Sequence, residues 1–379
     1  MATNDKVWTL NDLEQQVLDG NGAIYDTSYT PGGLWTWGYN VHGQLGDGTT
    51  VYKSSPIQVG NLTNWSNIAA GSNHNVAIKS DGTLWTWGNN GFGQLGDGTS
   101  VYKSSPIQVG SLTAWKSVAC GQYHTAAIKS DGTLWTWGNN AYGQLGDGTV
   151  VPKSSPIQVG NLTNWSNIAA GSNHNVAIKS DGTLWTWGYN YYGQLGDGTV
   201  VHKSSPIQVG NLTNWSKIAA GYNHTAAIKS DGTLWTWGQN AQGQLGDGTA
   251  VNKSSPIQVG NLTNWSKIAT GNYHNVAIKS DGTLWTWGYN VQGQLGDGTT
   301  VSKLSPIQVG NLTNWSKIAT GSDFTAAIKS DGTLWTWGSN SGGELGDGTT
   351  VYKSSPIQVG SLTNWKSAAG GQYHSVAIR

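Results

Sequence analysis

The segment LWTWG at residues 34–38 decides the fold of this chain of 379 residues, because it returns every 50 residues without insertion or deletion. Its seven copies begin at Leu34, Leu84, Leu134, Leu184, Leu234, Leu284 and Leu334. A repeat of this length built from short strands is typical of a propeller blade, which cannot bury its apolar faces alone and must pack against its neighbours. The sequence therefore predicts an all-β, seven-bladed propeller over residues 30–379, preceded by a leader over residues 1–29.

Each unit is expected to form four antiparallel strands, as the second copy illustrates. Alternation and turn chemistry place these strands at residues 64–70, 74–79, 84–88 and 106–109. The Asp81-Gly82 pair marks the hairpin between the second and third strands, since this dipeptide tolerates positive φ. The chain enters its first unit at a third strand and stops after a second strand. One blade is therefore expected to pair N-terminal with C-terminal strands and close the ring.

Tryptophan supplies the expected core. Trp35 and Trp37 are two residues apart, so both are predicted to project from one face of the third strand toward small groups of a neighbouring blade. The fourteen indoles of this type can bury roughly 150–250 Å² each. Trp65 and its equivalents in the first strands are assigned the same packing role.

Composition and charge exclude several function classes. Twenty Lys and Arg residues balance twenty Asp and Glu residues, so no basic field attracts nucleic acid or an anionic membrane. The N-terminus lacks a signal-peptide pattern and no stretch is long enough to span a bilayer, so synthesis in the cytoplasm is expected. Cys120, the single cysteine, stands where other copies have Ala, Thr or Gly, and is interpreted as a packed residue rather than a nucleophile.

The leader is expected to contain a short helix. Thr9 or Asn11 can cap it, Leu13 and Val17 give one apolar stripe, and Gly20 ends it. A helix of about nine residues is marginal in isolation. The leader is therefore expected to dock either on its own propeller or in a larger assembly.

Six histidines occupy one repeat position and invite a metal-site interpretation. They are His74, His124, His174, His224, His274 and His374, with Phe324 in the remaining copy. A ring of imidazoles can bind a metal ion, but Phe324 interrupts this ring. Packing with a backbone hydrogen bond is the favoured interpretation.

The remaining motifs also argue against a cofactor or an active site. Each GDGT loop, such as that at residues 46–49, offers one carboxylate, too few for calcium, and is interpreted as a solvated turn. The glycine-rich loops lack the Gly-Lys-Ser/Thr sequence of a phosphate cradle. No nucleophile, base and orienting acid stand out as a nonrepeated set. We expect no catalysis, no cofactor and no structural metal.

The copies differ mainly at four sites, those of Tyr39, Val41-His42, Tyr52 and Ser72-Asn73. In a four-stranded meander these sites share one edge of the blade, and the aromatic residues gather there. The candidate binding residues are Tyr39, His42, Tyr52, Phe92, Tyr102, Tyr123, Tyr142, Tyr189, Tyr191, Tyr192, Tyr222, Tyr273, Tyr289, Tyr352 and Tyr373. With intervening Asn, Gln and Ser, such a surface is similar to an antibody paratope. Neutral drift at unconstrained loop positions is the alternative.

The motif WG-N---GQLGDGT, followed by P--V and IAAG--H-VAI, resembles the regulator of chromosome condensation repeat. The resemblance covers residues 30–379 and implies a seven-bladed propeller more specifically than any function. Eukaryotic members include an exchange factor for a small GTPase that also contacts chromatin; this chain lacks a basic tail and an inserted wedge, so that activity is not carried over. Other relatives are a secreted bacterial propeller that inhibits β-lactamase and tryptophan-rich repeat proteins of cyanobacterial phages. The chain resembles the phage proteins most.

Two functions follow from these observations. The first is a non-enzymatic binding or structural propeller, part of a phage tail, baseplate or capsid, whose tyrosine-rich face binds a virion protein or a host-surface glycan or protein. The second is a soluble regulator or inhibitor of one protein, similar to a GTPase regulator or an enzyme inhibitor. Neither involves nucleic acid or membrane insertion, and the first implies a virion-associated protein.

Overall fold

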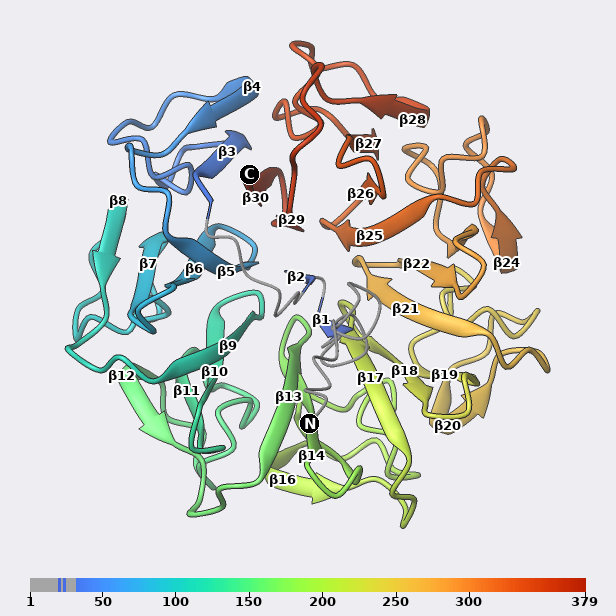
Figure 1. Ribbon diagram of the computed structural model, residues 1–379. Helices are drawn as coiled ribbons and strands as arrows, with labels where there is room; N and C mark the ends of the chain where they lie inside the picture. Colours follow the sequence, from blue (N-terminus) through green and yellow to red (C-terminus); the bar gives the residue numbers. More distant parts are fainter. Residues whose placement is uncertain (1–19, 22, 25–31) are drawn as a thin grey trace, which may run out of the picture.

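The computed structural model describes residues 20–21, 23–24 and 32–379. In this part of the chain, seven four-stranded antiparallel sheets form a ring of blades (Figure 1). Two further strands, β1 (Gly20–Asn21) and β2 (Ala23–Ile24), pair with each other. The described residues form no helix, and accordingly none of their segments is a helix able to cross a membrane. The predicted all-β propeller with seven blades is confirmed.

The four strands of each blade follow one another from the ring axis outward (Figure 1). The innermost strands are β5 (Trp65–Ala70), β9 (Trp115–Cys120), β13 (Trp165–Ala170), β17 (Trp215–Ala220), β21 (Trp265–Thr270), β25 (Trp315–Thr320) and β29 (Ser367–Gly370). The second strands are β6 (His74–Lys79), β10 (His124–Lys129), β14 (His174–Lys179), β18 (His224–Lys229), β22 (His274–Lys279), β26 (Phe324–Lys329) and β30 (His374–Ile378). The third strands are β7 (Leu84–Gly88), β11 (Leu134–Gly138), β15 (Leu184–Gly188), β19 (Leu234–Gly238), β23 (Leu284–Gly288), β27 (Leu334–Gly338) and β3 (Leu34–Gly38). The outermost strands are β8 (Lys103–Gln108), β12 (Lys153–Gln158), β16 (Lys203–Gln208), β20 (Lys253–Gln258), β24 (Lys303–Gln308), β28 (Lys353–Gln358) and β4 (Lys53–Gln58).

The predicted bounds are correct for the second and third strands of the blade. The first strand runs over residues 65–70 instead of 64–70, and the outermost strand over 103–108 instead of 106–109. The first strand begins at Trp65, where pairing with Lys79 starts. The outermost strand begins at Lys103 instead of Pro106, because the ladder shifts between the pairs Thr86–Ile107 and Gly88–Lys103. Pro106 lies inside this irregular stretch of an edge strand, where its missing N–H is tolerated.

One composite blade closes the ring, with the strand order β29-β30-β3-β4. The register of its central pair runs from Leu34 opposite Ile378 to Gly38 opposite His374. The N–H of Gly33 also donates to the carbonyl of Arg379 at 2.9 Å. The C-terminal strands are therefore the inner pair and β3 and β4 the outer pair, as predicted.

The core consists of seven equivalent clusters, each shared by two neighbouring blades. Trp87 is completely buried in a cluster that also contains Val376 and Ile378 of the closing blade. Its indole Nε1 donates to the carbonyl of Gln44 in that blade at 2.9 Å. A single side chain thus links adjacent blades by both apolar burial and a hydrogen bond.

The other tryptophan of each LWTWG segment has a different role from the one predicted. Trp85 and Trp87 do project from one face, since both rings contact Trp65, at 6.0 and 6.3 Å. Trp85, however, is only half-buried, and the Lys79 ammonium lies 3.5 Å from its ring centroid. These indoles therefore cover the core and attract a cation through the ring face, instead of filling the core.

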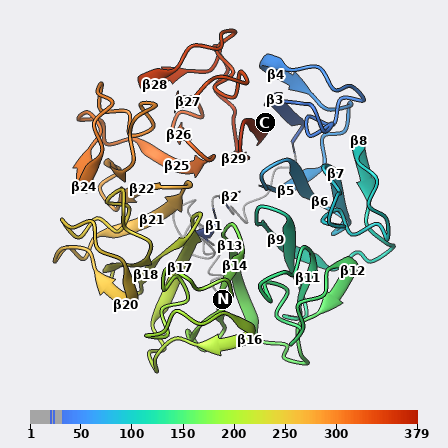
Figure 2. The same cartoon turned by 180° about the vertical axis from the view of Figure 1, so that it is seen from behind.

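The described part of the leader lies inside the ring. Strand β1 is beside β13, β17 and β21, and β2 is beside β5, β25 and β29. Both views place the two strands in the middle of the molecule (Figures 1 and 2). Of the predicted helix, Thr9, Asn11, Leu13 and Val17 lie outside the described residues, and Gly20, its predicted end, begins β1.

Candidate functional site

The fold brings all fifteen predicted site residues to one face of the ring. In each blade the turn after the innermost strand and the long loop after the third strand leave at the same edge, at residues 71–73 and 89–102 in the second copy. The SDGT turn and the GNLTN connection leave at the opposite edge. We call the two surfaces the tyrosine face and the SDGT face. The predicted clustering on one face is correct, whereas the binding role of the residues stays a prediction.

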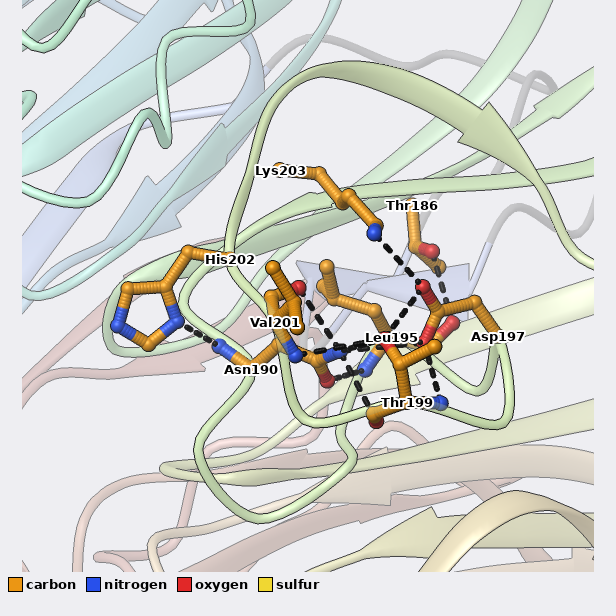
Figure 3. Close-up of polar contacts among 8 residues, drawn as sticks. All are labelled: Thr186, Asn190, Leu195, Asp197, Thr199, Val201, His202 and Lys203. Atoms are coloured by element: carbon orange, nitrogen blue, oxygen red, sulfur yellow. Dashed lines mark hydrogen bonds and ion pairs between the residues drawn. The ribbon is translucent and has the colours of Figure 1, made fainter.

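The long loop of each blade is organised by a buried asparagine, shown for Asn190 in Figure 3. Its side-chain Nδ2 donates to Asp197 at 3.1 Å and to the carbonyls of Thr199 and Val201 at 3.2 Å each. Its Oδ1 accepts a hydrogen bond from the N–H of Leu195 at 2.9 Å. Because one completely buried amide holds both arms of the loop, the loop keeps a fixed shape.

The acid of each GDGT segment belongs to the same network (Figure 3). Asp197 accepts from the N–H and the hydroxyl of Thr199 at 3.0 and 2.8 Å and pairs with Lys203 at 3.4 Å. Burial acts to raise the pKa of Asp197, but the bonds from Thr199 and Asn190 outweigh it and lower the pKa. The carboxylate is only 11% exposed. The turn itself is solvated as predicted, since residues 198–200 are exposed, but its acid also serves as a structural anchor.

The aromatic residues form four clusters, and each cluster bridges two neighbouring blades. The members are Tyr39, His42, Tyr52, Tyr102 and Tyr373 in the first; Phe92 and Tyr123 in the second; Tyr142, Tyr189, Tyr191, Tyr192 and His202 in the third; and Tyr222, Tyr273 and Tyr289 in the fourth. Tyr352 stands apart and is 47% exposed. The sequence predicted that these residues share one face, and the structure shows that on this face they form separate patches.

The third cluster offers the most exposed ring on this face. Tyr191 is 64% exposed and stacks on Tyr189 with an interplanar angle of 19°. Tyr189 in turn contacts Tyr142 and His202, both at 4.7 Å between ring centroids. His202, which the sequence analysis missed as a site residue, accepts a hydrogen bond from the N–H of Asn190 at 3.0 Å. His202 occupies the repeat position of Tyr52, and the variation between copies at this position was the available signal.

The histidine ring is structural, but its hydrogen bonds differ from those predicted. His74 Nε2 lies 3.1 Å from the Thr125 hydroxyl of the next blade, and that hydroxyl already donates to the carbonyl of Gln94. His124 Nε2 lies 3.2 Å from Asn175 Oδ1, which can only accept. In both contacts the histidine Nε2 must carry the proton and donate the hydrogen bond. The acceptor is a side chain of the next blade, whereas a backbone acceptor was predicted. Burial lowers the pKa of His74 to about 3, keeping it neutral.

Metal ligation finds no geometric support in this ring. Across the described residues, no three His, Cys, Asp or Glu side chains converge as a metal ion requires. Cys120 is half-buried at the end of β9. Burial strongly raises the pKa of the Cys120 thiol, so it is not an activated nucleophile.

One nonrepeated pair of acids was missed. Glu344 replaces the glutamine of the other six copies, is completely buried and accepts from Ser339 Oγ and the N–H of Gly342, both at 2.7 Å. Asp323 stands where other copies have Asn or Tyr. Burial, and then the charge of Glu344, raise the pKa of Asp323 to about 6. The signal was present in the sequence as GELGDGT in place of GQLGDGT.

Comparison with known proteins agrees with this geometry. The RCC1-like domain model matches residues 27–264, and the regulator of chromosome condensation (RCC1) repeat models match residues 281–328, 331–378, 265–294 and 315–344. The chain belongs to the RCC1-like domain family.

Solved structures confirm the fold of this RCC1-like chain. Human WBSCR16 superposes with a TM-score of 0.83 at 22% identity, covering 92% of this chain and 99% of that one. Prp20p from Saccharomyces cerevisiae gives a TM-score of 0.82 at 21% identity, covering 94% of this chain and 92% of that one. Yeast RCC1 (Prp20) in complex with Kap60 gives 0.82 at 19% identity, covering 97% and 92%. These identities support a shared architecture and leave the function to be argued from the site.

Proposed function

We propose that this protein is a non-catalytic binding propeller that holds a protein partner on its tyrosine face. The observation that carries the proposal is the set of four aromatic clusters bridging neighbouring blades on that face. The SDGT face, in contrast, repeats nearly the same residues in each copy. Two solved structures of similar fold support a protein partner, since Prp20p binds Gsp1p and histones and yeast RCC1 (Prp20) binds Kap60.

The loop network explains why such a surface suits binding. Tyrosine has few rotatable bonds, and the rings of Tyr189 and Tyr191 are already held by their neighbours. The buried Asn190 fixes the loop that carries them. A partner therefore meets an ordered surface and loses little conformational entropy on binding. Separate patches also allow several weak contacts to add.

The experiment compares two triple variants in affinity capture from the source cells, with a photoreactive residue at position 142, in the same aromatic cluster, to identify the bound protein. Tyr189→Ser, Tyr191→Ser and Tyr192→Ser together should abolish cross-linking to the partner while the ring stays folded. The matched control removes three exposed apolar side chains from the SDGT face, by serine replacement of Leu162, Leu212 and Leu262, which are 42%, 44% and 42% exposed. A partner lost in the leucine variant and retained in the tyrosine variant would refute the assignment of the face.

A narrower form of the proposal places the propeller in a phage particle. The resemblance to tryptophan-rich phage proteins motivates it, whereas membership in the RCC1-like family favours the regulator or inhibitor alternative. Mass spectrometry of purified particles separates the two. Stoichiometric presence in particles supports the virion role, and recovery with one soluble protein supports the regulator.

A further inference from the structure

A cavity of about 140 Å³ lies on the ring axis at the tyrosine face. Its wall is built from the last residues of the seven innermost strands and the first two residues of the turns that follow them. The second turn position, that of Ser72, is occupied by three serines, two glutamines, one asparagine and Tyr222. All seven side chains are uncharged and can both donate and accept hydrogen bonds.

Neighbouring turns hold this wall in a fixed arrangement. The first turn position is glycine in all seven copies. A Cβ on Gly71 would come within 2.6 Å of the carbonyl oxygen of Gly121 in the next blade. One position further, the N–H of Gln122 donates to the carbonyl of Ser172 at 3.1 Å, and the Ser172 hydroxyl donates to the Gln122 side chain at 2.7 Å. The polar groups around the cavity are therefore pre-ordered.

The charge and size of the wall limit what it can bind. Among the residues that the structure describes, none that lines the cavity is charged, and the strand residues below the turns are small, Ala70 and Cys120 among them. A charged ligand would find no counter-charge in the wall, and a purely apolar ligand would leave the polar groups without partners. A compact, neutral molecule rich in hydroxyl groups satisfies both conditions.

Aromatic rings stand at the edge of the cavity. Tyr222 is part of the wall, and its ring lies 5.6 Å from that of Tyr273 in the next blade. Pyranose rings present apolar C–H faces that pack on aromatic rings, while their hydroxyls need donors and acceptors of the kind that surround this cavity.

The described chain enters the ring at the SDGT face. Gly32 and Trp65 exchange backbone hydrogen bonds of 3.2 Å at the SDGT-face end of β5. Strand β1 lies beside β13, β17 and β21, and strand β2 lies beside β5, β25 and β29. The wall of the cavity, in contrast, is formed by the tyrosine-face ends of the innermost strands, so a ligand reaches it from the tyrosine face.

We propose that the axial cavity binds the terminal residue of a neutral carbohydrate. The Ser, Gln and Asn side chains of the second turn position hydrogen-bond its hydroxyls, and Tyr222 packs against its C–H face. The site is distinct from the peripheral patch formed by Tyr189, Tyr191 and Tyr192, so it does not depend on the protein-binding function proposed above.

Binding is tested with the full chain on immobilised neutral oligosaccharides that end in glucose, galactose, mannose or N-acetylglucosamine. Tyr222→Ala and Asn272→Ala should each weaken binding of the recognised sugar by about tenfold, as expected for loss of one stacking or hydrogen-bonding contact. The matched control is Tyr352→Ala, which removes an exposed ring of the same face far from the wall. This control should bind as the unaltered chain does.

Cys120 supplies a second readout, because it is the single cysteine and lines the cavity. The free form of the recognised sugar should slow alkylation of Cys120, whereas capped neutral peptides and sialic acid should not. The serine triple variant at positions 189, 191 and 192 should retain this protection even when partner binding is lost. The proposal is overturned if none of the four sugars binds, if peptides protect Cys120 and sugars do not, or if Tyr352→Ala weakens binding as much as Tyr222→Ala.

Discussion

Replacing Asp323 by asparagine should stabilise the ring at neutral pH. The pKa of this acid is raised to about 6 by burial and by the charge of Glu344. Asparagine is the residue of three other copies at this position, Asn73 among them, so the replacement has a structural precedent within the chain. The hydrogen bond from Gln294, 3.4 Å in length, can also be kept, because Gln44 donates in the same way to Asn73 at 3.2 Å.

The sign and size follow from the pKa of Asp323 in the folded and unfolded chain. The ordinary value is 3.8 and the folded value about 6, so folding disfavours the charged form. Below pH 3.8 both states are protonated and no penalty exists; the penalty grows between pH 3.8 and about 6 and is complete above that. At 1.36 kcal/mol per pH unit it amounts to about 3 kcal/mol. Coupling to Glu344 makes this figure an upper bound.

The assay is chemical denaturation at pH 5 and pH 8 for the original chain and Asp323→Asn. The original chain should lose stability between these two pH values relative to the variant, because only the original chain must ionise Asp323. The matched control is Asn173→Asp, which places the same acid beside Gln144 as Asp323 lies beside Gln294, but with the neutral Gln194 at the repeat position of Glu344, and should show a smaller penalty. Identical pH dependence for the original chain and Asp323→Asn would show that the acid carries no folding penalty.

Three further outcomes are expected. Deletion of residues 371–379 removes β30 from the closing blade and should open the ring and cause aggregation; a monomer with an unchanged Tm would contradict the closure argument. Asn190→Ala leaves the N–H of Leu195 and two loop carbonyls without their hydrogen-bond partner, so it should lower the free energy of unfolding by about 2–4 kcal/mol. Tyr191→Ala, which removes an exposed ring, is the control and should change this free energy by less than about 0.5 kcal/mol. Elemental analysis of the purified protein should find no stoichiometric transition metal, and one that only a strong chelator removes would restore the metal interpretation of the histidines.

The sequence predicted those features that depend on local pattern. The 50-residue register, the positions of Trp35 and Trp37 on one strand face and the offset chain ends were enough for the blade number and the closing blade. The common face of the variable sites followed from meander topology alone. None of these conclusions required knowledge of which side chains meet across blades.

The features that were missed depend on which side chains meet in the folded ring, both across blades and within one blade. His74 meets Thr125, which is 51 positions away, and only the placement of neighbouring blades brings the two together. Lys79 lies over Trp85 because β6 and β7 are adjacent, a contact that the strand assignment alone did not show. The GDGT loop was interpreted as a solvated turn, and the contacts of Asp197 with Asn190 and Lys203 were missed because these residues lie on either side of the motif.

The departures from the repeat are concentrated where the blade β25–β28 meets the closing blade. Asp323, Phe324 and Glu344 all lie in the former, and each replaces a neutral polar, histidine or glutamine residue of the other copies. In the closing blade Ser375 takes the place of the Thr or Asn that accepts from histidine elsewhere, and donates to the carbonyl of Glu344 at 2.8 Å. Phe324 needs no acceptor, so this junction exchanges a hydrogen bond for apolar burial and adds a buried charge. Glu344, whose charge contributes to the raised pKa of Asp323, accepts hydrogen bonds from Trp37 and Ser375 of the closing blade, so the pH-dependent penalty of Asp323 is coupled to the junction that closes the ring.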